Sequence, residues 1–281
     1  MKNRFLRAFL ILVLLLPLSC VGPAQSDRLV VLATVLPQAD MVRQVGGDNV
    51  EVIVMVPPGQ DPHTDLLGIS QMVKVSQAKA YFILGSGLDF ERTSLEKIKA
   101  QNREMLIFNT SEGIEIEGND PHIWLSVTNA VAMVQNICQG LTEIDPANAS
   151  YYQSNCDRYL DELVDLEEYI KYKFDGVDED KRYFLVYHPA LGYFASEYGL
   201  TQLAVEEEGK DPATADLARI IEEARAHDID YVFVEPWLDP SKARVIVSEL
   251  GAEIKVLDPL PESYIEGMKE ITDLIYEELA S

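Results

Sequence analysis

Residues 146–174 read PANASYYQSNCDRYLDELVDLEEYIKYKF. Within them, apolar residues recur at spacings of three and four, which is the pattern of an amphipathic helix: Tyr152, Cys156, Tyr159, Leu163, Leu166, Ile170 and Phe174. Asp145 before Pro146 is a typical helix start, and Gly176 is a typical end. This helix would be roughly 40 Å long, which is longer than a helix that covers a single sheet. We interpret it as a rigid link between two α/β lobes; a surface helix of one large domain is the alternative.

The N-terminus has the features of an export signal. Residues 1–19 combine three basic residues with an apolar run at 9–16 and are predicted to be a signal peptide. Cys20 follows a segment that resembles a bacterial lipoprotein cleavage site, so we expect a lipid anchor at Cys20 and a tether over 20–27; plain cleavage and secretion is the alternative. No later stretch approaches the length of a membrane span. The chain is therefore expected at the outer face of the cytoplasmic membrane or in the periplasm.

The chain is strongly acidic. It has 47 acidic and 23 basic residues, for a formal net charge of −24. Such a surface repels nucleic acid, so no nucleic-acid partner is expected, and it attracts cations. Solubility or adaptation to salt would explain the bulk charge equally well. We expect a monomer.

Short apolar runs alternate with helical patterns on both sides of the linking helix. In the N-terminal lobe, residues 28–145, strands are predicted at 29–36, 50–56, 80–84 and 105–108. In the C-terminal lobe, residues 176–281, they are predicted at 183–187, 200–205, 231–234 and 253–257. Strands alternating with helices indicate parallel sheets with helices on their faces. The predicted fold class is α/β, with two such lobes joined by the linking helix at 146–175.

Candidate ligands for a metal follow the predicted strands. Three of the four histidines, His63, His122 and His188, lie just beyond strands or in proline-containing loops, and Asp258 and Glu235 also lie at strand ends. Ligands bind at the carboxyl ends of strands in open α/β sheets. If the lobes face each other, three imidazoles and one carboxylate form a closed four-ligand set for a divalent transition metal.

A single loop histidine is more often an ordinary surface group than a ligand. Three of the four histidines nevertheless occupy equivalent positions beyond strands or in proline-containing loops, and this favours one site that all three share. The fourth, His227, is predicted at a helix C-terminus, where a favourable interaction with the helix dipole explains it without a metal.

Several segments carry a family resemblance. They resemble the ligand segments of zinc- and manganese-binding solute-binding proteins of ABC transporters: PGQDPH at 58–63, DPHIWL at 120–125, HPALGYF at 188–194 and LDPL at 257–260. EGKDP at 208–212 and FVE at 233–235 are also similar to that family. The order and spacing match over nearly the whole mature chain.

The resemblance implies two four-stranded lobes joined by one long backbone helix, a single metal between the lobes, and delivery to an ABC permease. Carried over by position, the ligands are His63, His122, His188 and Asp258, with Glu235 in a second shell. Three imidazoles and a carboxylate suit Zn²⁺, whereas Mn²⁺ prefers harder oxygen ligands. Many zinc-specific members have a long histidine-rich loop before the second histidine, which this chain lacks, so Mn²⁺ is the alternative.

A hydrolase, an adhesin and a chelate-binding protein are the alternative functions. A metal-dependent hydrolase needs an open coordination position and a general base; Glu235 could serve as the base, but four protein ligands would fill a tetrahedral site, and no G-x-S-x-G motif is present. An adhesin, or a binding protein for a metal chelate, would fit the same fold.

Cys138 and Cys156 flank the turn near Asp145 and are expected either to form a disulfide or to pack as buried thiols, not to bind the metal.

Overall fold

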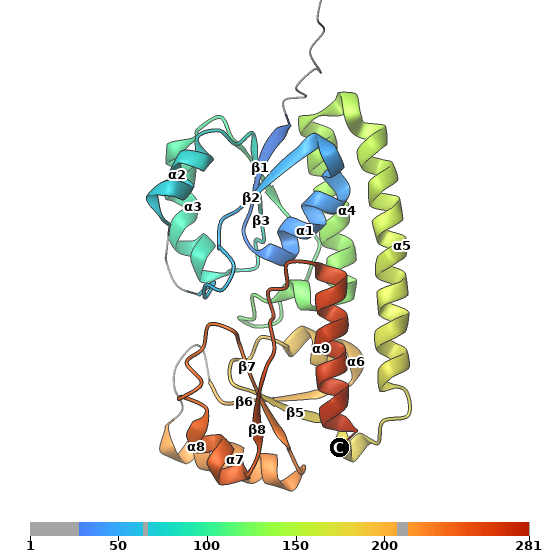
Figure 1. Cartoon of the computed structure of the whole chain (residues 1–281). Helices are drawn as coiled ribbons and strands as arrows, with labels where there is room; N and C mark the ends of the chain where they lie inside the picture. The colour runs from blue at the N-terminus through green and yellow to red at the C-terminus, as the bar shows by residue number, and fades with distance from the viewer. Residues whose placement is uncertain (1–27, 64–66, 207–212, 281) are drawn as a thin grey trace, which may run out of the picture.

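Two parallel four-stranded sheets form the framework of the protein. The computed structural model describes residues 28–63, 67–206 and 213–280 (Figure 1). The first sheet has the order β2-β1-β3-β4, with strands β1 (Leu29–Ala33), β2 (Val50–Val54), β3 (Ala80–Ile83) and β4 (Leu106–Asn109). The second has the order β6-β5-β7-β8, with β5 (Tyr183–Val186), β6 (Thr201–Ala204), β7 (Tyr231–Val234) and β8 (Glu253–Val256). Every pairing is parallel, which confirms the predicted fold class.

Helices flank both sheets. They are α1 (Leu36–Gly46), α2 (Ile69–Val75), α3 (Asp89–Gln101), α4 (Val127–Ile144), α5 (Ala149–Phe174), α6 (Gly192–Tyr198), α7 (Thr214–Ala226), α8 (Arg244–Leu250) and α9 (Tyr264–Leu279). Most predicted strand ends are within two residues of the observed ones, and two larger differences have a local cause. The first strand ends three residues early because Pro37 lies in the first turn of α1, where proline is tolerated. The sequence pattern predicts a helix over 95–102, but α3 begins at Asp89, with acidic residues in its first turn, where the helix dipole favours them.

Helix α5 is the long connecting element that the periodicity predicted. Its 26 residues span about 39 Å, and a 3-10 turn at Pro146–Asn148 precedes it. The seven residues of the predicted apolar stripe are the ones it buries. Helix α5 packs against α4 and α1 and also against α9, and Figure 1 shows it running along one side of both sheets.

The two sheets share one hydrophobic core. A large cluster joins the first sheet, α5, α9 and one face of the second sheet, where Phe184 and Val186 point. A smaller cluster lies on the opposite face, where Leu185 and Val232 pack against α7 and α8. Alternate residues of β5 thus belong to different clusters, as the two-residue period of a strand requires. The face toward α5 and α9 is continuous with the first lobe, whereas the α7–α8 face is separate.

Each lobe supplies a carboxylate to a helix of the other. The N–H of Tyr264, at the start of α9, donates to Asp40 Oδ2 of α1 at 2.9 Å. The N–H groups of Val127 and Thr128, at the start of α4, each donate to Glu197 of α6 at 3.0 Å. The first N–H groups of a helix lack partners within the helix and attract negative charge. These reciprocal caps fix the orientation of the two lobes.

Some predictions concern residues outside the described part of the chain. The signal peptide at 1–19, the tether at 20–27, the lipid site at Cys20 and the segment 208–212 all lie outside it. Among the residues that the structure describes, no helix combines the length and the apolar character needed to cross a membrane.

Candidate metal centre

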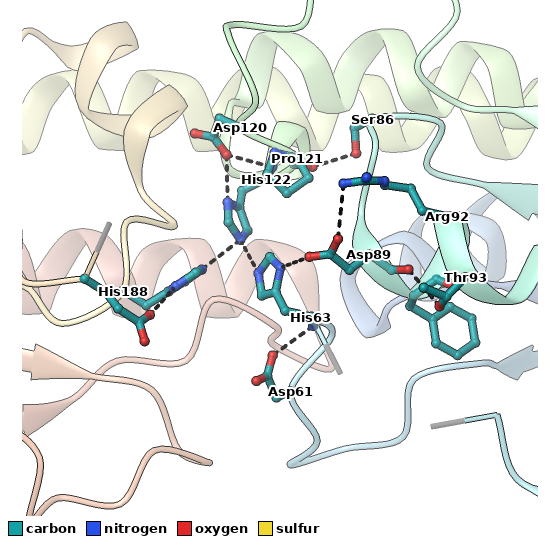
Figure 2. Close-up of polar contacts among 12 residues, drawn as sticks. Asp61, His63, Ser86, Asp89, Arg92, Thr93, Asp120, Pro121, His122 and His188 are labelled. Atoms are coloured by element: carbon teal, nitrogen blue, oxygen red, sulfur yellow. Dashed lines mark hydrogen bonds and ion pairs between the residues drawn. The ribbon is translucent and has the colours of Figure 1, made fainter. Parts of the chain in front are cut away.

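Three histidines meet between the two sheets. His63 lies in the loop after β2, His122 lies directly before the 3-10 turn Ile123–Leu125, and His188 follows β5. Their ligand atoms all lie within 4.8 Å of one another, and no other such group of histidine, cysteine or acidic residues occurs in the described part of the chain. The Nε2 atom of His122 is 3.1 Å from that of His63 and 3.3 Å from that of His188 (Figure 2).

This spacing fits a metal ion. A tetrahedral zinc with Zn–N bonds of about 2.0–2.1 Å separates its ligand nitrogens by about 3.3 Å, close to the two observed Nε2 separations. Imidazole lone pairs at this distance repel unless a proton or a cation lies between them. The three rings therefore have the spacing expected of three ligands of one metal ion.

A carboxylate faces the other nitrogen of each ring. The Nδ1 pairs are His63 with Asp89 (3.3 Å), His122 with Asp120 (2.7 Å) and His188 with Glu206 (3.0 Å). An ionised carboxylate only accepts hydrogen bonds, so each Nδ1 carries the proton and each Nε2 keeps its lone pair. Carboxylates at this position orient metal-binding histidines and raise their basicity.

A recurring turn positions two of the rings. In four Asp-Pro-X segments, the aspartate Oδ1 accepts the N–H of the residue two positions on: His63 to Asp61 (2.8 Å), His122 to Asp120 (2.9 Å), Leu260 to Asp258 (2.8 Å) and Ser241 to Asp239 (2.9 Å). Aspartate favours such turns because its side chain hydrogen-bonds the backbone two residues later. The motif is therefore a local fold, and only two of its four copies present a histidine.

Asp258, the fourth predicted ligand, does not join the three histidines here. Its side chain is exposed, and its Oδ1 accepts the N–H of Leu260 in the turn just described. Among the described residues, its carboxylate lies outside the group of ligand atoms that meet within 4.8 Å. The structure thus brings together three of the four predicted ligands, and coordination by Asp258 stays a prediction.

Glu235 lies close to the site, where a second-shell role was predicted. It is buried, with 6% of its surface exposed. Burial raises the pKa of Glu235 to about 7, and the neighbouring charges of His188 and Glu206 act on it in opposite directions. The sequence alone does not identify Glu206 as a partner of His188, because the run EEEGK at 206–210 predicts only an acidic loop. Nor does it identify Asp89, because the predicted helix begins after that residue.

The three imidazoles differ in their affinity for protons. Burial lowers the pKa of His122 to about 4, against the opposing effect of Asp120. Burial and repulsion from His188 also lower the pKa of His63. For His188, burial acts in the same direction, but the hydrogen bond to Glu206 and the charges of Glu235 and Glu206 outweigh it and raise the pKa. His188 is therefore the ring at which protons compete most strongly.

The segment that carries His122 is fastened to the second lobe. The Trp124 side chain is fully buried, and its Nε1–H donates to the carbonyl oxygen of Pro259 at 2.8 Å. The hydroxyl of Tyr264 donates to the carbonyl oxygen of Trp124 at 2.8 Å. The ring of Trp124 lies edge-on to His122, with the centroids 5.4 Å apart. His122 is thus held by the packing between the lobes.

A cavity of about 950 Å³ adjoins the centre. Asp89, Glu117 and Asp120 line it together with Arg92, and His63 and His188 form part of its wall. This excess of negative charge favours the approach of a cation.

The remaining candidates lie elsewhere. His227 stacks on the ring of Tyr183 at 3.5 Å and is not part of the histidine group. Cys138 of α4 and Cys156 of α5 are buried and unbridged, and neither belongs to that group. Of the two alternatives expected for the cysteines, the structure has the buried thiols.

Curated proteins similar to this chain are metal transport components. The "High-affinity zinc uptake system protein ZnuA" of Bacillus subtilis is 27% identical, over 91% of this chain and 89% of its own. The "Iron ABC transporter substrate-binding lipoprotein MtsA" of Streptococcus pyogenes is 30% identical, over 89% and 86%. The "Manganese ABC transporter substrate-binding lipoprotein PsaA" of Streptococcus mitis is 28% identical, over 92% and 91%.

Solved structures and a family model agree with this. A structure titled "Crystal structure of ZnuA" superposes with a TM-score of 0.86 and 33% identity, over 90% of this chain and all of its own. The family model described as "ZnuA: Zinc-uptake complex component A periplasmic" matches residues 31–278. Because this match spans almost the whole described chain, the protein belongs to the family of periplasmic zinc-uptake component A.

Proposed function

We propose that this protein binds a divalent transition metal, zinc in preference to manganese, and delivers it to an ABC permease. The metal would lie between the lobes, residues 28–145 and 176–281, on the Nε2 atoms of His63, His122 and His188. The observation that carries the proposal is the convergence of three Nε2 atoms whose Nδ1 partners are all carboxylates. That arrangement is typical of histidines that bind a metal.

The choice of zinc rests on the type of ligand. Three imidazole nitrogens suit a four-coordinate zinc ion, while manganese favours oxygen ligands and a higher coordination number. The similar proteins are named for zinc, iron and manganese, so family membership alone does not select the metal. We propose Asp258 as the fourth ligand, reached by a movement of its loop, with buried Glu235 beside His188 in the second shell.

Transfer to the permease would involve loops rather than whole lobes. The caps at Asp40 and Glu197 and the shared core resist a wide opening of the lobes. Release would then begin with the loops that carry His188 and Asp258. We propose that the protein acts as a monomer tethered to the membrane through lipid at Cys20, and that it transports its metal rather than catalysing a reaction.

Elemental analysis of protein purified without added metal tests the proposal. We expect about one zinc ion per chain. A competition titration at fixed pH and salt then compares zinc with manganese, and we expect zinc to displace manganese well below equal concentration. Protein that carries no transition metal and binds none would refute the function. Displacement of zinc by manganese at comparable concentrations would refute only the choice of metal.

A further inference from the structure

Helix α6 of the second lobe lies against the segment of the first lobe that carries His122. It packs on the 3-10 turn Ile123–Leu125, which directly follows this histidine. Beyond that turn, Glu197 of α6 accepts the first two N–H groups of α4. The start of α6 contacts the same segment on the other side of His122, at residues 117–120. The helix therefore holds the first lobe both before and after the histidine.

Tyr193, the second residue of α6, spans the loop before His122. Its side chain is buried, and its hydroxyl accepts the N–H of Glu117 at 2.8 Å and donates to the carbonyl oxygen of Asp120 at 3.4 Å. The N–H of Asp120 in turn donates to the carbonyl oxygen of Glu117 at 3.0 Å, which closes a turn. One hydroxyl of the second lobe thus bridges the two ends of a turn in the first lobe.

Gly192, the first residue of α6, lies directly against the carboxylate of Asp120. A β carbon at residue 192 would lie 2.6 Å from Asp120 Oδ2, closer than β carbons approach other atoms in proteins. The other oxygen, Oδ1, accepts both the backbone N–H and the Nδ1–H of His122, at 2.9 and 2.7 Å (Figure 2). Because the two oxygens belong to one rigid group, a side chain at residue 192 would displace both.

We propose that Gly192 is a positioning residue for the metal centre, because the space that it leaves lets Asp120 orient His122. The inference rests on the proposed function, since the orientation of His122 matters here for binding a metal. A carboxylate on the Nδ1–H fixes the ring and its tautomer. A ligand that is displaced by about half an ångström loses its productive geometry. Tyr193 supports the same arrangement by holding the turn at 117–120.

The segment that begins α6 also carries a proposed ligand of its own. His188 lies four residues before Gly192, and the two residues directly before that glycine are 3% and 1% exposed. A movement of the loop that carries His188 would therefore also move the residue that supports Asp120. Loss of metal that begins at His188 would then weaken the orientation of His122 in the other lobe.

Zinc titration of Gly192→Ala tests the proposal. We expect zinc affinity to fall about tenfold, the lower end of the range for groups that orient a ligand. In the Asp120→Ala background there is no carboxylate to displace, so the same change should alter affinity by less than about twofold. Ser196→Ala, at an exposed position of α6, is the control and should leave affinity within about twofold. An equal loss from Gly192→Ala in both backgrounds, or no loss in either, would overturn the proposal.

Stability and NMR measurements separate positioning from a loss of folding. Alanine favours a helix more than glycine does, so the thermal midpoint of metal-free Gly192→Ala should change little. The Nδ1–H proton of His122, observed by NMR in the metal-free protein, reports the hydrogen bond to Asp120. Its resonance should move in Gly192→Ala and stay in place in Ser196→Ala. An unmoved resonance would contradict the positioning role whether or not zinc binds, whereas an unaltered protein that binds no zinc would contradict the proposed function itself.

Discussion

The two sides of the metal centre are built differently. On the first-lobe side, His122 is 4% exposed, its pKa is lowered to about 4 by burial, and the hydrogen bonds of Trp124 hold its segment. On the second-lobe side, burial lowers the pKa of His188, but the hydrogen bond to Glu206 and the charges of Glu235 and Glu206 outweigh it and raise the pKa. Burial therefore has the larger effect on the pKa of His122, whereas neighbouring carboxylates have the larger effect on that of His188.

This difference bears on how a metal at the proposed site would bind and leave. With its pKa lowered to about 4, His122 stays neutral near pH 7 and keeps a lone pair on Nε2 that a metal would need. Because its pKa is raised, His188 takes up a proton at higher pH than the other two rings, and a proton on its Nε2 atom would block a metal there. Binding would then be anchored on the first lobe, and release would begin on the second.

Replacement of one of the three proposed histidine ligands should have the largest effect on zinc affinity. We expect His122→Ala to weaken zinc binding by more than about a hundredfold, because it removes a preorganised imidazole. His63→Ala and His188→Ala should also cost more than about tenfold. Zinc titration against a chromogenic chelator measures these values. His227→Ala, which changes a ring stacked on Tyr183, is the control, and a loss there as large as in the other three would contradict the assignment.

The carboxylates that accept the Nδ1–H groups should also differ in how much each contributes to zinc affinity. Asp120 both forms the turn before His122 and accepts its Nδ1–H. Asp120→Ala should therefore weaken zinc binding by about a hundredfold, at the top of the second-shell range. Asp120→Asn keeps an oxygen for the turn and should cost about tenfold, as should Glu206→Gln. The same affinity for the alanine and asparagine variants would show that the turn itself contributes nothing.

Acidification should act mainly through the second-lobe side. The pKa of His188 is raised, whereas those of His63 and His122 are lowered. Zinc affinity should be full above the pKa of His188 and fall about tenfold per pH unit below it. Affinity measured from pH 7.5 to pH 5 tests this, and a flat profile would exclude a centre dominated by imidazole.

The variant Glu206→Gln tests whether His188 is the group responsible for this pH dependence. The amide oxygen still accepts the Nδ1–H of His188, but the charge that raises its pKa is lost. The pH at which affinity begins to fall should move lower in this variant. An unchanged profile would assign the acid sensitivity to another group, and Glu235 would be the first to examine.

The hydrogen bond from Trp124 to the carbonyl oxygen of Pro259 should contribute to the stability of the folded protein. Trp124→Phe leaves the carbonyl oxygen of Pro259 without its donor and should lower the free energy of unfolding by about 1–3 kcal/mol. Denaturant unfolding of the metal-free protein measures this. Trp237→Phe, at a partly exposed position, is the matched control and should cost less.

The cysteines should have the smallest effect on the metal. In the double variant Cys138→Ala, Cys156→Ala, we expect unchanged zinc stoichiometry, because both thiols lie outside the histidine group. Burial also raises the pKa of Cys156 to about 12, which disfavours the thiolate that a metal needs. A thiol count on denatured, unreduced protein should find both free. Loss of zinc from the double variant would contradict their exclusion as ligands.

Several features followed from the sequence because they depend on local geometry. The period of α5 is set by the helix itself, so its seven buried residues could be read directly. The Asp-Pro-X turns involve atoms two residues apart. The strand ends placed His63, His122 and His188 at equivalent edges of two parallel sheets.

Other features depended on how distant segments pack. His122 finds its carboxylate two residues away, but His63 and His188 find theirs at Asp89 and Glu206, which are 26 and 18 residues distant. The Asp40 cap of Tyr264 spans 224 residues. No local period encodes such pairs, because the two histidine pairs depend on how distant loops of one lobe pack together, and the Asp40 cap depends on how the two lobes pack. For the same reason, the sequence could place Asp258 at a strand end, but only the tertiary structure decided that its carboxylate lies outside the three-histidine group.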